Sequence, residues 1–256
     1  MKIALAQINS VIGGFETNRQ KIIGFAAEAA SQNVDLVLFP ELAVCGYPPM
    51  DLLDQNAFTE QNIRSVRILQ QSLPPDIAVG IGFVNRTPYS HGKSLVNEYG
   101  IIHNCRLVFE QIKTLLPTYD VFDEARNFEP AQDWNVFVFA GERIGIAVCE
   151  DVWRETDIPG TSYRIDPVRM LLDKGATLLC VPSASPFVAG KHEVRLELAR
   201  RIAARGNVPI VYVNAVGAND SIIFDGRSFV LSPGQTVPDT CSTSVAFDEE
   251  LLVWSR

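Results

Sequence analysis

Hydrophobic positions follow two alternating patterns along the chain. Short, nearly continuous apolar runs, such as Ile3-Ala4-Leu5-Ala6 and Leu36-Val37-Leu38-Phe39, are typical of buried β-strands. Apolar residues that recur every three or four positions, with charges between them, predict amphipathic helices. Strands are expected at 3–8, 36–39, 77–83, 94–98, 101–109, 134–139, 143–148, 177–181, 209–213, 221–224, 227–232 and 243–247, and helices from a Thr17 cap onward and at about 58–72, 164–174 and 191–206.

The order of these elements predicts an α/β fold. Helices separated by single strands indicate crossover connections, whereas paired short strands, such as the two expected around a Tyr99-Gly100 turn, indicate hairpins. One mixed sheet covered by helices and two such sheets would both satisfy this pattern, which leaves the choice open. No repeat, linker or low-complexity tract interrupts the sequence, so residues 1–256 are expected to form one domain.

Composition and charge narrow the classes of partner. The 256 residues are 47% hydrophobic and 20% charged, as in ordinary globular proteins, and the formal net charge is −8. Nucleic acid and anionic membrane surfaces are therefore not expected as partners, because each phosphate contact needs a cation. No apolar run reaches the roughly 18–20 residues of a membrane span, and the first run, 3–8, predicts a strand rather than a signal peptide.

The cysteines bear on the compartment and on metal binding. Five of them are scattered along the chain without a Cys-x-x-Cys pair, at positions 45, 105, 149, 180 and 241. This odd set fits neither a disulfide framework nor a structural zinc site. The sequence therefore predicts a cytoplasmic protein that uses neither a metal nor another cofactor.

Cys149 is the candidate nucleophile, because it ends an apolar run and two carboxylates follow it directly. Two other apolar runs lead in the same manner to Glu41 and to Lys113. If these strand ends meet at one edge of a sheet, a thiol, a carboxylate and an ammonium converge there, which is a set suited to acyl transfer. Histidine is the usual partner of a nucleophilic cysteine, but the sequence context singles out none of His91, His103 and His192.

Each member of this set has a chemical task in amide hydrolysis. Glu41 can take the thiol proton and return it to the leaving amine, while Lys113 can stabilise the oxyanion together with the backbone N–H of Glu150. Taken one at a time, each residue also has an ordinary interpretation: a buried cysteine is usually a small hydrophobe, and a glutamate after Phe-Pro is often a surface loop residue.

Three segments that contain these residues resemble the signature segments of the nitrilase, or carbon–nitrogen hydrolase, superfamily. They are Phe39-Pro40-Glu41-Leu42, Lys113-Thr114-Leu115-Leu116-Pro117 and Val148-Cys149-Glu150-Asp151. The resemblance implies a four-layer αββα sandwich, with Glu41 as base, Lys113 as oxyanion stabiliser and Cys149 as nucleophile. It also implies a homo-oligomer, at least a dimer.

A narrower resemblance links the chain to the glutaminase domain of glutamine-dependent NAD synthetases. It is carried by residues 42–53, 116–124, 149–153, 183–191, 213–220 and 224–228. This resemblance implies a glutamine pocket formed by Tyr47, Tyr119, Glu150, Ser183 and Ser185. Loop packing for the two tyrosines and turn formation for the two serines are the alternatives.

The function implied is hydrolysis of the side-chain amide of L-glutamine through a thioester, with ammonia passed to an NAD synthetase. No Ser-Gly-Gly-x-Asp loop or P-loop occurs in the sequence, so a further domain or a separate subunit is expected to bind ATP. The alternatives are a stand-alone amidase acting on another small carboxamide or an N-carbamoyl compound, and a non-catalytic binding module. Trp153 and Glu124 are possible accessory residues; Glu124 could orient Lys113 or a substrate amide, or could form a salt bridge with Arg126 instead.

Overall fold

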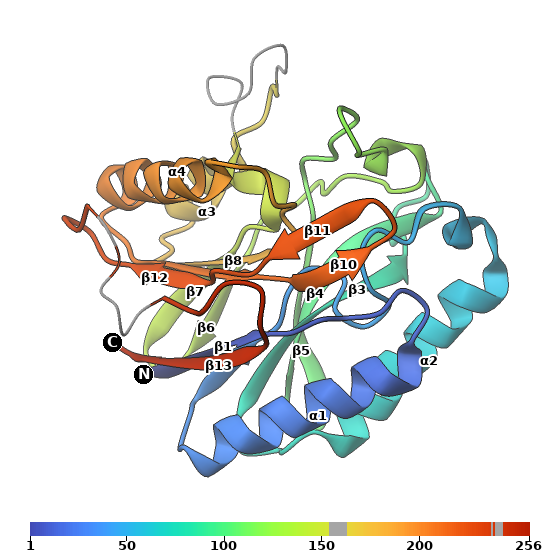
Figure 1. Ribbon diagram of the computed structural model, residues 1–256, viewed down its shortest axis with the longest axis horizontal. Helices are drawn as coiled ribbons and strands as arrows, with labels where there is room; N and C mark the ends of the chain where they lie inside the picture. Colours follow the sequence, from blue (N-terminus) through green and yellow to red (C-terminus); the bar gives the residue numbers. More distant parts are fainter. Residues whose placement is uncertain (154–162, 237, 239–242) are drawn as a thin grey trace.

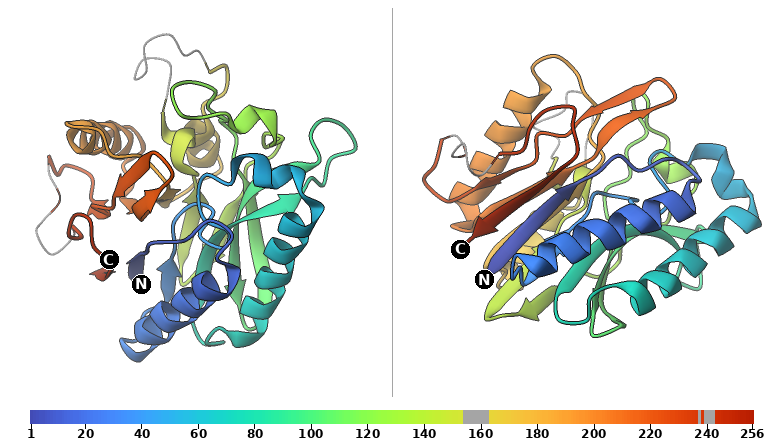
Figure 2. Two further views of the ribbon diagram at one scale, coloured as in Figure 1. Left: turned by 45° about the vertical axis from the view of Figure 1, so that its right-hand side comes forward. Right: turned by 60° about the horizontal axis from the view of Figure 1, so that its bottom comes forward.

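Two β-sheets pack face to face in the computed structural model, which describes residues 1–153, 163–236, 238 and 243–256 (Figures 1 and 2). The first sheet has six strands, in the order β13 (Glu250–Ser255), β1 (Lys2–Gln7), β2 (Leu36–Leu38), β3 (Ala78–Arg86), β4 (Leu95–His103) and β5 (Arg106–Ile112). The second has five, in the order β12 (Phe229–Leu231), β9 (Ile210–Asn214), β8 (Leu178–Ser183), β7 (Glu142–Ile146) and β6 (Val136–Phe139). A separate hairpin joins β10 (Val216–Asn219) to β11 (Ile222–Asp225).

Helices cover the outer face of each sheet. The six-stranded sheet is covered by α1 (Phe15–Ser31) and α2 (Asn56–Ser72), and the five-stranded sheet by α3 (Pro167–Asp173) and α4 (Lys191–Gly206) (Figure 1). The order of layers is therefore αββα, as the nitrilase resemblance implied. Among the described residues, no helix combines the length and the apolar character needed to cross a membrane.

The burial of strand β2 explains why its sequence is continuously apolar. Leu36 and Leu38 pack between the two sheets, whereas Val37 packs against the helices on the outer face. Neighbouring side chains of a strand point to opposite faces, so a strand covered on both faces needs hydrophobic residues throughout. The same division holds in β1, where Ile3 and Leu5 lie between the sheets.

The Tyr99-Gly100 turn predicted from the sequence is wrong. Strand β4 runs through both residues, and the Tyr99 hydroxyl donates a 2.8 Å hydrogen bond to the backbone oxygen of Phe39. The chain turns instead at Asn104 and Cys105, which both adopt positive φ angles. Gly100 serves close packing, because a Cβ atom there would lie 2.6 Å from a methyl group of Leu107.

Two other boundary predictions also fail. Helix α1 begins at Phe15, with Gly14 at its N-cap, so Thr17 lies inside the first turn. The expected strand at 243–247 makes only isolated bridges, at Thr243 and Ala246, while the last strand is β13, which pairs antiparallel with β1. This strand contains the apolar run 251–254, but it lies at the edge of the sheet, and only Leu252 is buried.

Glu98 on β4 makes stability depend on pH. Its side chain is buried and accepts a hydrogen bond from Asn85, and burial raises its pKa from 4.5 to about 7, with the nearby Glu110 charge adding to the rise. The stability that the protonated form contributes is present below pH 4.5 and is lost as the pH rises through about 7.

We therefore expect Glu98→Gln to increase the free energy of unfolding by about 2–3 kcal/mol at pH 8 and by little at pH 4.5. Urea denaturation at both pH values measures this, with exposed Glu28→Gln as the control. An equal effect of Glu98→Gln at both pH values would contradict the assignment.

Candidate active site

Glu41, Lys113 and Cys149 meet where strands of both sheets end. Glu41 follows β2, Lys113 follows β5, and Cys149 begins the short 3-10 helix η3 (Cys149–Val152) after β7. All three are buried, and Lys113 Nζ lies 2.7 Å from Glu41 Oε1. The sequence predicted convergence at one edge of a single sheet; the structure brings together the edges of two facing sheets.

The carboxylate of Glu41 is held by groups from three other segments. Its Oε1 accepts hydrogen bonds from Lys113 Nζ and, at 2.7 Å, from Asn97 Nδ2, and its Oε2 accepts from the Ala184 backbone N–H at 3.2 Å. Gly82 permits the close approach of the backbone here, because a Cβ atom on it would lie 2.3 Å from Leu42 N. The side chain is thus fixed in one orientation, as a proton-transfer group requires.

The Lys113 ammonium lies between two carboxylates. Its Nζ is 2.7 Å from Glu41 Oε1 and 2.7 Å from Glu124 Oε1, and Glu124 also accepts a 2.8 Å hydrogen bond from the Tyr47 hydroxyl. Burial alone would lower the pKa of Lys113, but the two carboxylates raise it well above its usual value. Of the two roles considered for Glu124, the contact with Lys113 is the one observed; Arg126 lies 4.0 Å from Asp54 instead.

Two carboxylates around one ammonium leave an excess negative charge. Burial raises the pKa of Glu124 to about 7, against the lowering effect of Lys113. Its Oε2 is buried and has no hydrogen-bond partner among the described residues. A proton can therefore reside on this carboxylate near neutral pH.

Cys149 occupies a backbone conformation that is unusual for a residue with a side chain. Its φ angle is +46°, in the left-handed region. Burial and the negative charge of Glu41 raise the pKa of the thiol well above its usual value, and Lys113 acts in the opposite direction. The resting thiol is therefore protonated, and it needs a base such as Glu41 to become a nucleophile.

A second polar group surrounds Glu150. Its carboxylate accepts hydrogen bonds from the hydroxyls of Tyr119 and Tyr163, both between 2.8 and 3.0 Å. Burial raises the pKa of Glu150; the charge of Lys113, the two tyrosine hydrogen bonds and, last, the charge of Lys191 act against that rise. Lys191 Nζ lies 5.3 Å from the ring centroid of Trp153. An anionic group and a cationic group thus flank the segment that follows Cys149.

Ser183 and Ser185 are buried in the segment that leaves strand β8. The Ser185 hydroxyl accepts a hydrogen bond from Arg195 Nε at 3.1 Å, and the same guanidinium pairs with Asp225 at 2.8 Å. Asn214 Oδ1 accepts a hydrogen bond from Ser185 N. Ser183 is thus the last residue of β8, and Ser185, two residues further on, is held by Arg195 and Asn214.

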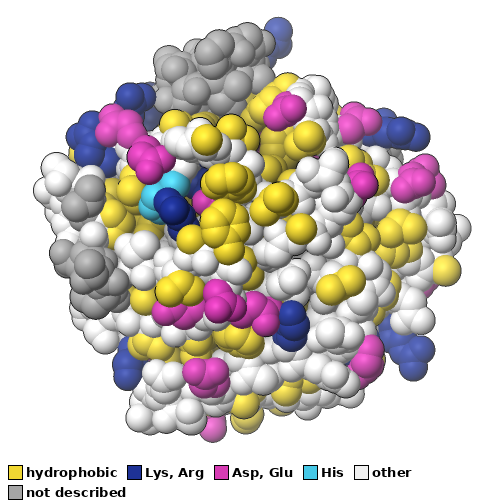
Figure 3. All heavy atoms as spheres, viewed as in Figure 1, with side chains coloured by type: hydrophobic (Ala, Val, Ile, Leu, Met, Phe, Trp, Pro, Cys, Tyr) yellow, Lys and Arg dark blue, Asp and Glu magenta, His cyan; other side chains and the backbone are white. Residues whose placement is uncertain are grey.

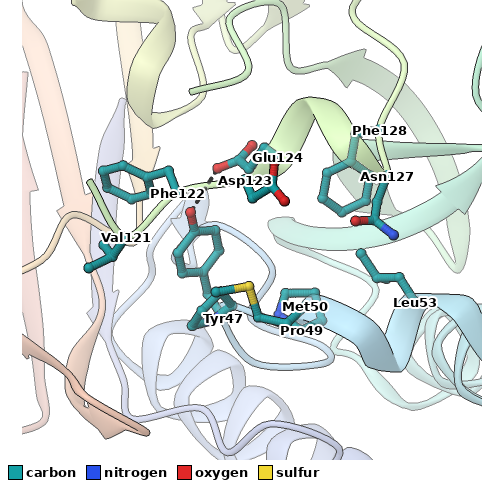
Figure 4. Close-up of a pocket in the computed structure, with 11 residues that line it drawn as sticks. Tyr47, Pro49, Met50, Leu53, Val121, Phe122, Asp123, Glu124, Asn127 and Phe128 are labelled. Atoms are coloured by element: carbon teal, nitrogen blue, oxygen red, sulfur yellow. Dashed lines mark hydrogen bonds between the residues drawn. The ribbon is translucent and has the colours of Figure 1, made fainter. Parts of the chain in front are cut away.

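Tyr47 and Glu124 line a small cavity of about 20 Å³ that is open to solvent (Figure 4). The Tyr47 hydroxyl points to Glu124, and apolar side chains that include Leu53, Phe122 and Phe128 line the rest of the cavity. In this structure Tyr47 therefore supports Glu124, while the hydrogen bonds to Glu150 come from other tyrosines.

Several residues of the site were not found from the sequence. Asn97 could have been suspected, since it is a polar residue within an apolar strand. Lys191 and Tyr163 come from segments whose sequence carries no sign that they return to Cys149. Asp151 was visible beside the cysteine, but only the structure shows that its carboxylate bonds to the backbone of a distant segment.

The chain was compared with known protein families and structures. The family model for carbon–nitrogen hydrolases matches residues 2–243. The glutamine-dependent NAD(+) synthetase of Synechocystis sp. is 41% identical over 99% of this chain and 46% of its own length. That of Acinetobacter baylyi is 35% identical over 90% of this chain and 40% of its own length. The chain thus spans less than half of these curated relatives.

Solved structures give the same picture of the fold. The glutamine-dependent NAD+ synthetase of Acinetobacter baumannii, in complex with ADP, superposes with a TM-score of 0.87 and 33% identity, over 98% of this chain and 44% of that one. An amidase from Nesterenkonia sp. superposes with a TM-score of 0.81 and 24% identity, over 99% of this chain and 89% of that one. The αββα architecture is therefore shared with both.

Proposed function

We propose, from the premise that this chain belongs to the carbon–nitrogen hydrolase family, that it hydrolyses the side-chain amide of L-glutamine and releases ammonia. The observation that carries this proposal is the pairing of Glu150 with two tyrosines next to Cys149, with Lys191 nearby. Glutamine differs from simple amides by its α-ammonium and α-carboxylate groups, and these call for one anionic and one cationic partner.

The reaction is assigned to three residues. Glu41 takes the Cys149 proton as the sulfur attacks the amide carbon, and Lys113 with the Glu150 backbone N–H stabilises the negative oxygen of the tetrahedral intermediate. Glu41 returns the proton to the amide nitrogen, and the C–N bond breaks. Ammonia departs, and the acyl group remains on Cys149 as a thioester. Water then attacks the thioester, giving its proton to Glu41, and glutamate and the free thiol are released.

The substrate pocket is assigned to Tyr47, Tyr119, Glu150, Ser183 and Ser185, with Lys191 as the partner of the α-carboxylate. Glu150, held by Tyr119, binds the α-ammonium group. Glu124 orients Lys113, Tyr47 acts through Glu124, and Trp153 forms a wall beside Lys191.

The domain, the partner and the compartment of this activity are proposed as well. Residues 1–256 are assigned to one glutaminase domain that supplies ammonia to an NAD synthetase domain or subunit, in the cytoplasm. Hydrophobic side chains gather around the β10–β11 hairpin on the face shown in Figure 3, among them the exposed Phe187, Ile223 and Phe247. An exposed apolar group of this kind supports assembly with a second copy or with the synthetase.

The proposal is tested by measuring ammonia release from L-glutamine and from a panel of small amides and N-carbamoyl compounds. Selective turnover of glutamine is expected. Turnover of another amide with none of glutamine would assign the chain to the stand-alone amidases. A lack of turnover on all substrates, with a synthetase present as well as absent, would favour a binding module.

Glu150→Gln should impair glutamine without impairing a neutral amide. The change removes the charge that binds the α-ammonium group, so KM for glutamine should rise about 10- to 100-fold. Turnover of butyramide, which has no ammonium group, should change little in the same variant. Steady-state kinetics on both substrates, with Glu28→Gln as the control, measures this. Equal losses on both substrates would remove Glu150 from ammonium binding.

A further inference from the structure

The Asp151 carboxylate accepts backbone hydrogen bonds from two segments that are distant from each other in the sequence. Its Oδ1 accepts hydrogen bonds from Thr114 N at 2.9 Å and Leu115 N at 2.7 Å, and its Oδ2 accepts from Val148 N at 3.0 Å. The side chain is 2% exposed. One buried carboxylate thus holds three peptide N–H groups. Burial raises the pKa of Asp151 to about 7, and these three hydrogen bonds act against that rise.

The positions of these donors connect Asp151 to the reacting groups. Thr114 directly follows Lys113, which leaves the six-stranded sheet after β5, and Val148 directly precedes Cys149, which leaves the five-stranded sheet after β7. Asp151 therefore ties the ammonium-bearing segment of one sheet to the thiol-bearing segment of the other.

The backbone at Cys149 needs such support. A left-handed φ of +46° is unfavourable for a residue with a side chain and persists only where neighbouring contacts impose it. Asp151 N donates a 3.0 Å hydrogen bond to Val148 O, while Val148 N donates to the Asp151 side chain. These two bonds close the turn that carries the thiol.

We propose that Asp151 is the positioning residue that sets the distance between the Lys113 ammonium and the Cys149 thiol. The kinetic test of this inference rests on the proposed function, whereas the alkylation test does not depend on the substrate. Both carboxylate oxygens are needed as acceptors. Asparagine offers only one oxygen, so Asp151→Asn must turn an NH₂ group towards a peptide N–H and release one of the two segments.

The test compares wild type with Asp151→Asn and with Asp35→Asn. Asp35 is the matched control, because its carboxylate also accepts a backbone N–H bond, from Lys2, at the start of β1. For each protein, kcat and KM for glutamine are measured per folded molecule. The rate of Cys149 alkylation by iodoacetamide is followed by peptide-resolved mass spectrometry, so that exposed Cys105 is counted separately.

Asp151→Asn should lower kcat about 100-fold with KM within about 3-fold of wild type, since the reacting groups move while the pocket for the substrate head group stays. Alkylation of Cys149 should slow about 10-fold because the thiolate loses the nearby ammonium. Asp35→Asn should leave kcat, KM and alkylation unchanged.

A kcat and an alkylation rate for Asp151→Asn both within about 3-fold of wild type would overturn the inference. A rise in KM alone would assign Asp151 to the pocket and overturn it as well. If wild type did not turn over glutamine, the proposed function would fail, but the alkylation ratio would still decide the role of Asp151. If Asp151→Asn did not fold, Asp151→Glu, which keeps the charge but displaces it, would be judged by the same criteria.

Discussion

Cys149→Ala should reduce ammonia release from glutamine by at least about 10⁴-fold, because no thioester can form without the sulfur. The free energy of unfolding should change by no more than about 1 kcal/mol. Alanine keeps the Cβ atom and the same left-handed backbone as Cys149, and only one sulfur atom is lost. Glutamine should still bind, since Glu150 and Lys191 remain.

Ammonia assays, urea denaturation and isothermal titration with glutamine check the three expectations. Cys180→Ala provides a matched control, because Cys180 is also a buried thiol of the same cluster but lies within strand β8 rather than after a strand end. That variant should lose stability and keep its turnover per folded molecule. Turnover by Cys149→Ala above about 1% of wild type would mean that another group is the nucleophile.

Lys113→Met should lower both activity and stability. The variant leaves the carboxylates of Glu41 and Glu124 buried without their shared cation, each of which now lies 2.7 Å from Lys113 Nζ. Breaking a buried pair in this way costs about 3–5 kcal/mol of stability. Activity should fall by at least about 10³-fold, because the oxyanion loses its charged partner.

The loss of stability in Lys113→Met should depend on pH and on Glu124. It should be larger at pH 8 than at pH 6, because burial raises the pKa of Glu124 to about 7 and protonation neutralises this unpaired carboxylate as the pH falls. The double variant Lys113→Met/Glu124→Gln should regain part of the stability, and the exposed Lys174→Met should stay within about 0.5 kcal/mol of wild type. Denaturation of wild type, Lys113→Met, Glu124→Gln and the double variant at both pH values gives the coupling energy between Lys113 and Glu124. Simple additivity of the two changes would show that Lys113 and Glu124 do not stabilise each other.

The sequence predicted the chemistry of the strand ends because those ends combine two strong signals. Continuous apolar runs mark strands buried on both faces, and a charged or nucleophilic residue directly after such a run has few places to lie except the rim of a sheet. Cys149 directly follows such a run and Glu41 follows one after Pro40, whereas three residues separate Lys113 from the end of its run at Phe109. The pattern of hydrophobic residues did not distinguish one sheet from two. The αββα order came from the family resemblance.

Contacts between distant segments could not be predicted in the same way. Lys191 opens helix α4 and Tyr163 precedes α3, and neither has a local pattern that shows where its side chain lies. At Tyr99-Gly100, by contrast, a local signal was present but led to the wrong prediction of a turn. There a glycine that normally marks a turn is required by close packing with Leu107 inside a long strand.

Because the three site residues are divided between two sheets, the packing between the sheets sets the distances within the site. Glu41 and Lys113 move with one sheet and Cys149 with the other, and the distance between the sheets is set by the volumes of side chains such as Leu38 and Val213. A methyl group added or removed in that layer therefore changes the reach of the base as well as the packing.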